Sequence, residues 1–341
     1  MNSTLPTLNG ERPKAIALLS GGLDSALAAK LVKDQGVDVV GLHLVTPFGC
    51  DTDVKKVAES LSIPLLFKEK GAAYLDLVEK PRYGYGKNMN PCIDCRIFMF
   101  QLADVIRQDE KADFIVTGEV MGQRPMSQTK VSIGIIDKKS PIEGLVVRPL
   151  SATRFEPSIP EQLGWVDREK FFGITGRARN EQLAMAKSIG VSEFAPPGGG
   201  CLLTDSAFSQ RLRDFFEHQA PVSEEQKMAQ AQTLRLGRHF RMSHKFKVII
   251  SRNDLENQKL ESLWQASGGA FFYPENFQGP AAIAYGDLTE GTQGLVGALL
   301  SRYGKSHQSD KPTVRVLAKN LDQIIPITEF ISDEDLERMR L

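Results

Sequence analysis

Residues 15–30 of the sequence read AIALLSGGLDSALAAK, and this stretch decides the fold. The apolar run before Ser20 suits a strand that is buried on both faces of a parallel sheet. Gly21 and Gly22 permit backbone angles and close approaches that a side chain would block. Asp24 and Ser25 then open a run of good helix formers. We therefore predict a buried strand, a glycine-rich turn and a helix.

The turn between this strand and this helix is suited to an anion. Backbone N–H groups of the turn and the positive end of the helix dipole converge on one point there. The stretch is neither a Walker loop, which needs G-x-x-x-x-G-K-[ST], nor the dinucleotide-binding pattern G-x-G-x-x-G. We expect the ligand to be a polyphosphate.

The order Ser-Gly-Gly-x-Asp-Ser after a strand resembles the pyrophosphate loop of the N-type ATP pyrophosphatases. In that family ATP is cleaved between its α and β phosphates, and an AMP adduct forms on the substrate. The resemblance implies an adenine nucleotide α hydrolase-like fold with ATP and Mg²⁺ as cofactors, and a catalytic Asp24 on the metal side. The residues that it implies around the pyrophosphate are Ser20, Gly21, Gly22, Asp24 and Ser25.

Length and composition limit the class of protein. The chain has 341 residues, which is enough for two domains. Because 42 basic residues are balanced by 42 acidic ones, we expect any nucleic acid to bind through a local basic patch. No apolar stretch approaches the roughly 18 residues of a membrane span, and residues 1–14 lack the apolar core of a signal peptide. Four cysteines are too few for a disulfide framework. We therefore expect a cytoplasmic protein with reduced thiols and no membrane partner.

The first half of the chain alternates short apolar runs with longer amphipathic ones. We predict strands at 37–45, 65–68 and 114–117 and helices at 54–61 and 97–107, which indicates an α/β domain with a parallel sheet and helices on both faces. Ligands of such sheets gather at the carboxyl ends of the strands. Ser20, His43, Gly118 and Glu119 would share that rim, so we add His43 and Gly118 to the expected ATP contacts.

A pair of cysteines follows an irregular stretch in the same half. Residues 80–90, KPRYGYGKNMN, have no clear periodicity and predict a loop. Asn90 can cap a helix that begins at Pro91, which places Cys92 and Cys95 in its first turn and on one face. The helix dipole at this position favours thiolates, the form of cysteine that attacks electrophiles and binds metals.

A third cysteine, Cys201, follows three glycines that permit close backbone approach. The thiols could be inert small hydrophobes, which is the interpretation that we favour for Cys50. Cys92, Cys95, Cys201 and Cys50 could instead hold a structural zinc. Three thiolates could also carry an iron–sulfur cluster with one open iron. In a version without metal, one thiol bears a persulfide and another resolves it.

Several further motifs resemble those of tRNA thiolation enzymes. Residues 90–95, NPCIDC, resemble the N-P-C-x-x-C element of 2-thiouridylases and 4-thiouridine synthases. Residues 117–129, TGEVMGQRPMSQT, are similar to a T-G-E-x-x-G-Q-x-x-S-Q-T motif of 4-thiouridine synthases with one extra residue, and 148–150 match the R-P-L of that family. In cluster-dependent members a CxxC pair and one distal cysteine hold a [4Fe–4S] cluster beside the ATP site. The resemblance implies that Cys92, Cys95 and Cys201 do so here, with Cys92 and Cys201 catalytic.

The resemblance covers about residues 14–204 and has two departures. Familiar 4-thiouridine synthases carry an RNA-binding region before the ATP loop, and some end in a rhodanese domain with a persulfide cysteine. Here the loop begins at Ser20 and no cysteine follows Cys201, so we expect neither element. This shifts the expectation towards a cluster-bound sulfide, and the sulfur donor would be sulfide or a cysteine desulfurase.

The last third of the chain has a different composition. We predict helices at 206–217, 254–265, 290–303 and 332–340, a strand at 313–317 and a linker or turn at 220–225. A basic stretch between them is interleaved with Phe240 and Phe246, which suits phosphate contacts and base stacking, although a hairpin with solvated charges would look the same. The candidate RNA contacts are Arg235, Arg238, Arg241, Lys245 and Lys247. The pattern of this region resembles the RNA-binding domain of the NFACT proteins.

These features predict three segments: a flexible N-terminus (1–13), an ATP pyrophosphatase and thiolation domain (14–205) and a smaller α+β RNA-binding-like domain (206–341). The function that follows is a tRNA sulfurtransferase that adenylates a uridine carbonyl with ATP and replaces its oxygen by sulfur, giving 4-thiouridine. Alternatives are 2-thiouridine synthesis, another ATP pyrophosphatase reaction, or a non-catalytic RNA-binding adaptor. A homodimer is compatible with the sequence.

Overall fold

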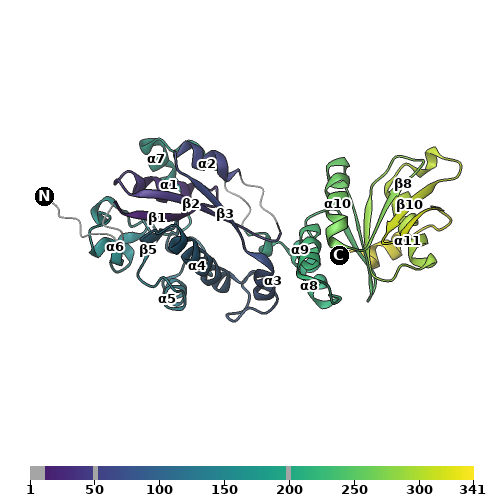
Figure 1. Cartoon of the computed structure of the whole chain (residues 1–341), viewed down its shortest axis with the longest axis horizontal. Helices are drawn as coiled ribbons and strands as arrows, with labels where there is room; N and C mark the ends of the chain where they lie inside the picture. Colours follow the sequence, from purple (N-terminus) through teal and green to yellow (C-terminus); the bar gives the residue numbers. More distant parts are fainter. Residues whose placement is uncertain (1–11, 49–52, 197–200) are drawn as a thin grey trace. The chain divides into compact units, whose positions relative to one another are not determined.

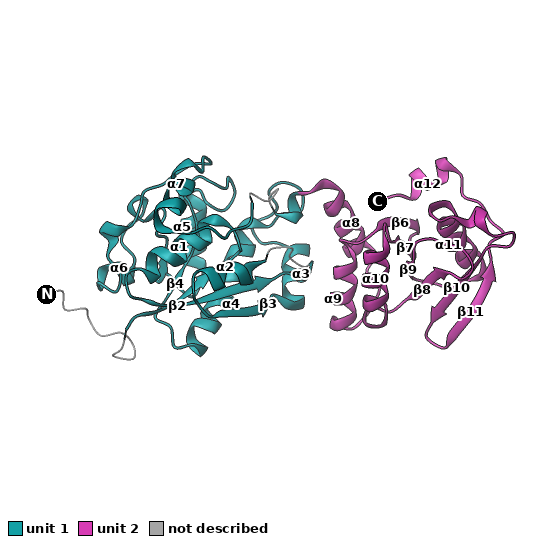
Figure 2. Cartoon of the chain, turned by 90° about the horizontal axis from the view of Figure 1, so that it is seen from above, with its two compact units in different colours: residues 1–204 teal, residues 205–341 magenta. Residues whose placement is uncertain are grey.

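The computed structural model describes residues 12–48, 53–196 and 201–341. The chain divides into two compact units, residues 1–204 and residues 205–341 (Figure 2). Cys50 and the three glycines before Cys201 lie outside the described residues, so the interpretation of Cys50 as inert stays a prediction.

The N-terminal unit is built on a parallel sheet of five strands in the order β3-β2-β1-β4-β5 (Figure 1). The central strand β1 pairs with β2 on one side and with β4 on the other, so the strand order reverses at β1. Ligands of open α/β sheets bind at such a switch point. The strands are β1 (Lys14–Leu18), β2 (Asp38–Val45), β3 (Leu65–Glu69), β4 (Phe114–Val116) and β5 (Val146–Val147).

Helices cover both faces of this sheet, as the sequence predicted. Successive side chains of β1 point to opposite faces, so Ala15 and Ala17 lie in one core and Ile16 and Leu18 in the other. The helices are α1 (Leu23–Lys33), α2 (Val54–Ser60), α3 (Gly71–Glu79), α4 (Cys92–Asp109), α5 (Lys130–Lys139), α6 (Ile159–Gln162) and α7 (Asn180–Ile189).

The C-terminal unit contains a six-stranded sheet in the order β11-β10-β8-β9-β7-β6, and every paired neighbour is antiparallel. The α+β class of this unit is therefore confirmed. Its strands are β6 (Arg238–Ser243), β7 (Phe246–Ile250), β8 (Ala270–Pro274), β9 (Ala282–Tyr285), β10 (Thr313–Ala318) and β11 (Leu321–Pro326). Its helices are α8 (Ser206–Glu217), α9 (Glu224–Thr233), α10 (Asp254–Ser267), α11 (Glu290–Tyr303) and α12 (Asp333–Met339).

One expectation for the C-terminal unit needs correction. The expected linker at 220–225 is two residues too long, because helix α9 begins at Glu224 after a capping box formed by Ser223 and Gln226.

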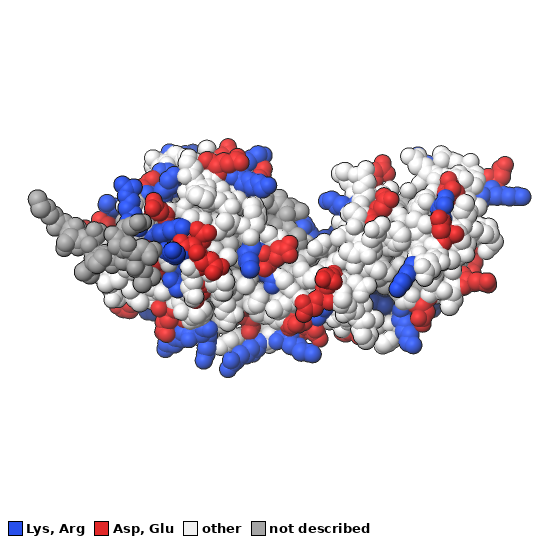
Figure 3. Space-filling model, viewed as in Figure 1, with Lys and Arg blue, Asp and Glu red and all other residues white. Residues whose placement is uncertain are grey.

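Charge is spread over both units. On the face drawn in Figure 3, basic and acidic side chains are interspersed over each unit. In the described part of the chain, no helix is long and apolar enough to cross a membrane.

Candidate functional site

The glycine-rich loop is held by hydrogen bonds within itself. The Ser20 N–H donates to Ser25 Oγ (3.2 Å), and Ser25 Oγ donates to the Gly22 carbonyl (2.9 Å). Gly21 has a φ of 79°, a left-handed conformation that glycine adopts without strain. The loop therefore leads from strand β1 into helix α1 in one defined shape, as an anion site at a helix N-terminus requires.

Asp24, in the first turn of α1, has one satisfied and one open oxygen. Its Oδ2 accepts from Gln123 Nε2 (3.1 Å) and lies 3.6 Å from an Arg179 guanidinium nitrogen. Its Oδ1 is buried and has no hydrogen-bond partner among the described residues. Sequence reasoning missed both partners, because Gln123 and Arg179 are far from Asp24 in the chain and neither is part of the loop motif.

His43 and Gly118 lie on the same rim as the loop. His43 is buried, and its Nδ1 lies 2.8 Å from the Leu19 carbonyl oxygen. Gly118 packs under the start of helix α1, where a Cβ atom would stand 2.4 Å from the Asp24 carbonyl carbon. The structure thus gives both residues a packing role, and their contacts with ATP stay predictions.

A buried ion network connects the cysteine helix to the ends of strands β4 and β5. Glu119, which is 2% exposed, contacts Arg96 Nε at 3.1 Å and Arg148 Nε at 2.9 Å. The Arg148 guanidinium also forms a bidentate pair with Asp137. Arg96 directly follows Cys95 in α4, so the network fixes the start of that helix against the sheet rim.

The charges in this network set its pKa values. Burial raises the pKa of Glu119, but Arg96 and Arg148 outweigh burial and the net shift is downward. Burial raises the pKa of the Asp137 carboxyl, and Arg148 offsets only part of that shift. Two carboxylates therefore face two guanidinium groups.

Cys95 lies beside two buried polar side chains from the end of β3 and from α3. Tyr74 Oη is 3.3 Å and Lys70 Nζ is 3.5 Å from Cys95 Sγ. Lys70 and Tyr74 are 6% and 2% exposed, and the ammonium group lies 4.2 Å from the centroid of the tyrosine ring. No sequence pattern pointed to Lys70, because it follows a strand that carries no motif.

Cys92 receives a hydrogen bond from a residue that we expected to act differently. Helix α4 begins at Cys92, one residue later than predicted, and no side chain caps it. The Asn90 amide instead donates to Cys92 Sγ (3.0 Å). Asn90 therefore contacts the thiol and not the helix end.

Cys201 belongs to a segment that returns to the loop before helix α4. The Met89 N–H donates to the Leu203 carbonyl (3.1 Å), and Asn88 Nδ2 donates to the Thr204 carbonyl (2.8 Å). Burial raises the pKa of the Cys201 thiol, and the negative charges of Cys95 and Cys92 add to that shift. The three thiols are therefore near enough to interact electrostatically.

Tyr74 contacts Cys95 and interacts electrostatically with all three cysteines. Its pKa is raised well above the ordinary value, first by burial and then by negative charge on Cys95, Cys201 and Cys92. The phenol therefore keeps its proton and can donate a hydrogen bond to sulfur. Within the described residues, however, no three His, Cys, Asp or Glu side chains are arranged to hold a metal ion.

The segment before Cys201 also pairs with the glycine-rich loop. The Ala195 N–H donates to the Gly21 carbonyl (2.8 Å), and Gly22 and Ala195 form a parallel bridge. Ala195 thus contacts the anion loop, while 203–204 contacts the loop before the cysteine helix. The thiols and the glycine-rich loop lie on the same side of the N-terminal unit.

The five candidate RNA contacts of the C-terminal unit have different surroundings. Arg241 and Lys247 both bind Asp214, and Lys247 is 6% exposed. Arg238 lies 4.7 Å from the centroid of the Tyr303 ring. Arg235 is half-buried and Lys245 is exposed. They do not form one exposed stripe, and their contacts with RNA stay predictions.

Two family models match separate parts of the chain. Residues 10–156 match the model "Thiamine biosynthesis protein (ThiI)", and residues 237–339 match "NFACT protein RNA binding domain". The chain joins a ThiI-like segment to an NFACT-like segment. The recognition of a tRNA thiolation family and of an NFACT-like domain in the sequence is thereby confirmed.

The ThiI-like segment also has curated relatives. A "Probable tRNA sulfurtransferase" of Methanothermobacter thermautotrophicus is 35% identical over 200 residues, which are 56% of this chain and 44% of that protein. A "tRNA-specific 2-thiouridylase MnmA" of Karelsulcia muelleri is 30% identical over 187 residues, 50% of this chain and 48% of the relative. The chain thus spans less than half the length of these relatives.

One solved structure is similar to the chain over 52% of each molecule. It is described as a "Crystal structure of a 4-thiouridine synthetase - RNA complex with bound ATP", with 24% identity and a TM-score of 0.34.

Proposed function

We propose that this chain is a tRNA sulfurtransferase that uses ATP to convert a tRNA uridine into 4-thiouridine, in the cytoplasm. The proposal rests on two observations, one for Ala195 and one for Cys201. Ala195 pairs with the Gly21–Gly22 turn, and Cys201 lies within electrostatic range of Cys92 and Cys95. An anion loop and three thiols on one rim suit a reaction that first activates an oxygen with a nucleotide and then replaces it with sulfur.

In the first step the O4 carbonyl oxygen of the uridine attacks the α phosphorus of ATP. The bond from the α phosphorus to the bridging oxygen breaks, pyrophosphate leaves, and the uridine carries AMP on O4. Ser20, Gly21, Gly22 and Ser25 form the loop whose backbone N–H groups would receive the pyrophosphate. Arg179, 3.6 Å from Asp24, is placed to move from that carboxylate to the phosphates.

Asp24 fits a Mg²⁺ ligand because its Oδ1 is buried without a partner among the described residues. A bound Mg²⁺ would offset the negative charge of the phosphates. Gln123 keeps the carboxylate in place through its Oδ2.

In the second step sulfur attacks C4 of the activated uridine. The donor is a sulfide, or a persulfide that a cysteine desulfurase loads onto Cys95, where Lys70 and Tyr74 can stabilise negative charge on sulfur. The C4–S bond forms, the C4–O4 bond breaks, and AMP leaves with O4. On the persulfide route, the thiolate of Cys201 or Cys92 then attacks Cys95 Sγ, which releases thiouridine and leaves a disulfide for a dithiol reductant to reopen.

Cys92, Cys95 and Cys201 are also the three thiols that a [4Fe–4S] cluster with one open iron would need. When bound, such a cluster would hold a sulfide at the open iron. Among the described residues, these side chains are not arranged to surround a metal ion, and this applies to zinc as well as to a cluster.

The proposed RNA partner is tRNA, bound through the C-terminal unit. Residues 237–339 match an RNA-binding domain model, and this supports that role. A uridine within folded tRNA must leave its stack to reach the rim, which costs a few kcal/mol.

The test is an assay of the purified full chain with a tRNA transcript, ATP, Mg²⁺ and sulfide under anaerobic conditions. We expect AMP, pyrophosphate and 4-thiouridine, measured by chromatography and by mass spectrometry of the nucleosides. With a cysteine desulfurase in place of sulfide as the sulfur donor, Cys95→Ser should lower thiouridine formation at least about 100-fold, and Cys50→Ser is the matched control because we favour an inert interpretation of Cys50.

Three results would contradict the proposal or narrow it. A chain that binds tRNA but releases no AMP is an RNA-binding adaptor. AMP release with 2-thiouridine as the product shows the other thiolation chemistry. A Cys95→Ser variant with full activity in the assay with a cysteine desulfurase would contradict sulfur transfer through this thiol.

A further inference from the structure

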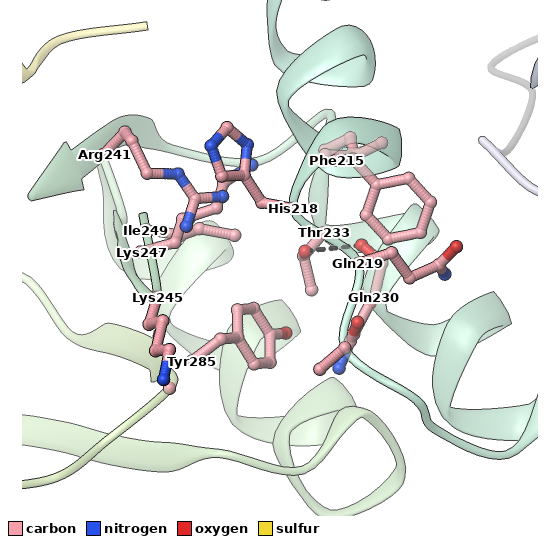
Figure 4. Close-up of a pocket in the computed structure, with 13 residues that line it drawn as sticks. Phe215, His218, Gln219, Gln230, Thr233, Arg241, Lys245, Lys247, Ile249 and Tyr285 are labelled. Carbon is pink, nitrogen blue, oxygen red and sulfur yellow. Dashed lines mark hydrogen bonds between the residues drawn. The ribbon is translucent and has the colours of Figure 1, made fainter. Parts of the chain in front are cut away.

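The C-terminal unit contains a pocket between helices α8 and α9 and strands β6, β7 and β9 (Figure 4). Its volume is about 90 Å³, which is room for a group of a few heavy atoms but not for a whole nucleotide. Three basic side chains, Arg241, Lys245 and Lys247, line it. Of the described residues that line the pocket, none is Asp or Glu.

The cations of this pocket are only partly neutralised. Asp214 lies behind the wall and binds both Arg241 (2.7 and 2.8 Å) and Lys247 (2.7 Å). One carboxylate cannot balance two cations, so a positive charge remains before Lys245 is counted. Burial lowers the pKa of the Lys247 ammonium to about 8, and Asp214 offsets only part of that cost.

Both bound cations still have hydrogens to donate. A guanidinium has five N–H groups and an ammonium has three, of which Asp214 takes two from Arg241 and one from Lys247. The opposite side of the pocket carries the amides of Gln219 and Gln230, as Figure 4 shows. The Gln219 Nε2 is buried and has no hydrogen-bond partner among the described residues, whereas Gln230 Nε2 donates to the Ser267 carbonyl (3.0 Å). The remaining donors of Arg241, Lys247 and Gln219 suit a ligand that only accepts hydrogen bonds.

The position of Lys245 at this pocket is fixed by backbone packing. Gly286 has a φ of 115°, and a Cβ atom there would stand 1.8 Å from the Lys245 carbonyl oxygen. Only glycine permits this approach of the end of β9 to the turn between β6 and β7. The backbone of Lys245 is therefore held at the edge of the pocket, while its side chain is exposed.

We propose that this pocket binds one phosphate group of the RNA, with Arg241, Lys245 and Lys247 as its cationic ligands. The proposal deepens the RNA-binding role under "Proposed function" and rests on it. A phosphate fits because it is small, acceptor-only and negatively charged. It would complete the charge balance that Asp214 leaves incomplete.

The first test follows the side-chain methyl group of Ile249, which lines the pocket, by NMR of the full chain during a titration with inorganic phosphate. We expect a saturable shift for Ile249 and none for Ile324 on strand β11, which serves as the matched control. Lys245→Ala should abolish or weaken the Ile249 shift. An unmoved Ile249, or an equal shift of both methyl groups, would overturn the proposal.

The second test measures tRNA affinity of the full chain against salt concentration. Loss of one phosphate contact lowers the slope of log K against log salt by about one. We expect that change for Lys245→Ala and none for Lys319→Ala, an exposed lysine of the same unit outside the pocket. Equal slopes for both variants and the unmodified protein would overturn the proposal.

The two tests together separate this inference from the proposed function. Phosphate binding at Ile249 with an unchanged tRNA slope would assign the pocket to a free anion and reject the RNA phosphate. If Lys245→Ala leaves the salt slope of tRNA binding unchanged and the protein still forms 4-thiouridine, the RNA phosphate site is rejected and the proposed enzymatic function stands. If phosphate shifts the Ile249 methyl signal as expected but the protein releases no AMP, the proposed enzymatic function is rejected instead.

Discussion

Glu119 in the N-terminal unit and Asp214 in the C-terminal unit are both buried carboxylates held between two cations. Glu119 binds Arg96 and Arg148, and a second carboxylate, Asp137, also binds Arg148. Asp214 binds Arg241 and Lys247 without a second acidic residue in the wall of the adjoining pocket. The first network has as many negative as positive groups, and the second has an excess of positive charge.

This difference indicates different uses for buried charge. A balanced network has no electrostatic need for a ligand, and in the N-terminal unit it fixes the cysteine helix to the sheet rim. An unbalanced network next to a cavity is more favourable with an anion than without one. Charge balance therefore distinguishes a structural ion network from a binding site, even where the residue types are the same.

The two tryptophans allow each network to be studied separately. Trp165 lies in the N-terminal unit and Trp264 in the C-terminal unit, and the sequence contains no others. Fluorescence of a Trp264→Phe background therefore follows the unfolding of the first unit. A Trp165→Phe background follows the second.

The largest effect is expected for Arg148→Met in the Trp264→Phe background. The change leaves Glu119 with Arg96 and leaves Asp137 without a cation in the network, so urea unfolding should show a loss of about 3–5 kcal/mol. Adding Asp137→Asn should restore part of that loss, because it removes the carboxylate left without a partner. A loss below about 1 kcal/mol would show that the balanced network is not structural.

The next effect is a rise in stability of the C-terminal unit at alkaline pH. The pKa of Lys247 is about 8 in the folded chain and near its ordinary value of 10.5 in the unfolded chain. The unfolded state therefore binds more protons between these two values, and the free energy of unfolding increases with pH there. We expect a gain on the order of 2 kcal/mol between about pH 7 and pH 9.5 in the Trp165→Phe background.

Lys247→Met in that background is the control for this pH dependence. Since the variant lacks the titrating ammonium, its unfolding free energy should be flatter over the same range than that of the background protein. Identical pH profiles for the two proteins would assign the dependence to another group.

A smaller effect is expected for the same Lys247→Met change at neutral pH. Asp214 keeps its bidentate pair with Arg241, so one cation balances one carboxylate and the unfolding free energy should change by no more than about 1 kcal/mol. A loss above about 3 kcal/mol would make Lys247 as important as Arg148 and would remove the contrast between the units.

The smallest effect is expected for a pair at the protein surface. Arg302 and Asp333 form an ion pair between exposed side chains. Arg302→Gln should change the stability of the C-terminal unit by no more than about 0.5 kcal/mol in urea unfolding. A larger change would mean that burial does not explain the effects in the two networks.

Much of the N-terminal fold could be predicted because its strands are apolar runs beside strong motifs. Strand β1 and helix α1 follow directly from AIALLSGGLDSALAAK. Elements without an apolar period were missed. Helix α9 has the sequence EEQKMAQAQT and strand β11 has LDQIIP, and each depends on packing against neighbours that the sequence does not identify.

The residues of the candidate site also fall into those that the sequence could predict and those that it could not. The loop and the three cysteines could be found because their chemistry lies in short patterns. Lys70, Arg179 and Gln123 could not be found, because only the folded chain brings them to Cys95 and Asp24. In the basic stretch 235–247 the sequence gives the charge of Lys247 but not its burial against Asp214, and its contact with RNA stays a prediction.

The packing of Gly118 under helix α1 has a consequence for how such proteins can change over evolutionary time. A side chain at this position would collide with the backbone of Asp24 and Ser25. The two segments can therefore diverge only together, whatever molecule the rim accepts. A descendant that acquired a new substrate would still inherit this glycine, as a record of the helix above it and not of the reaction.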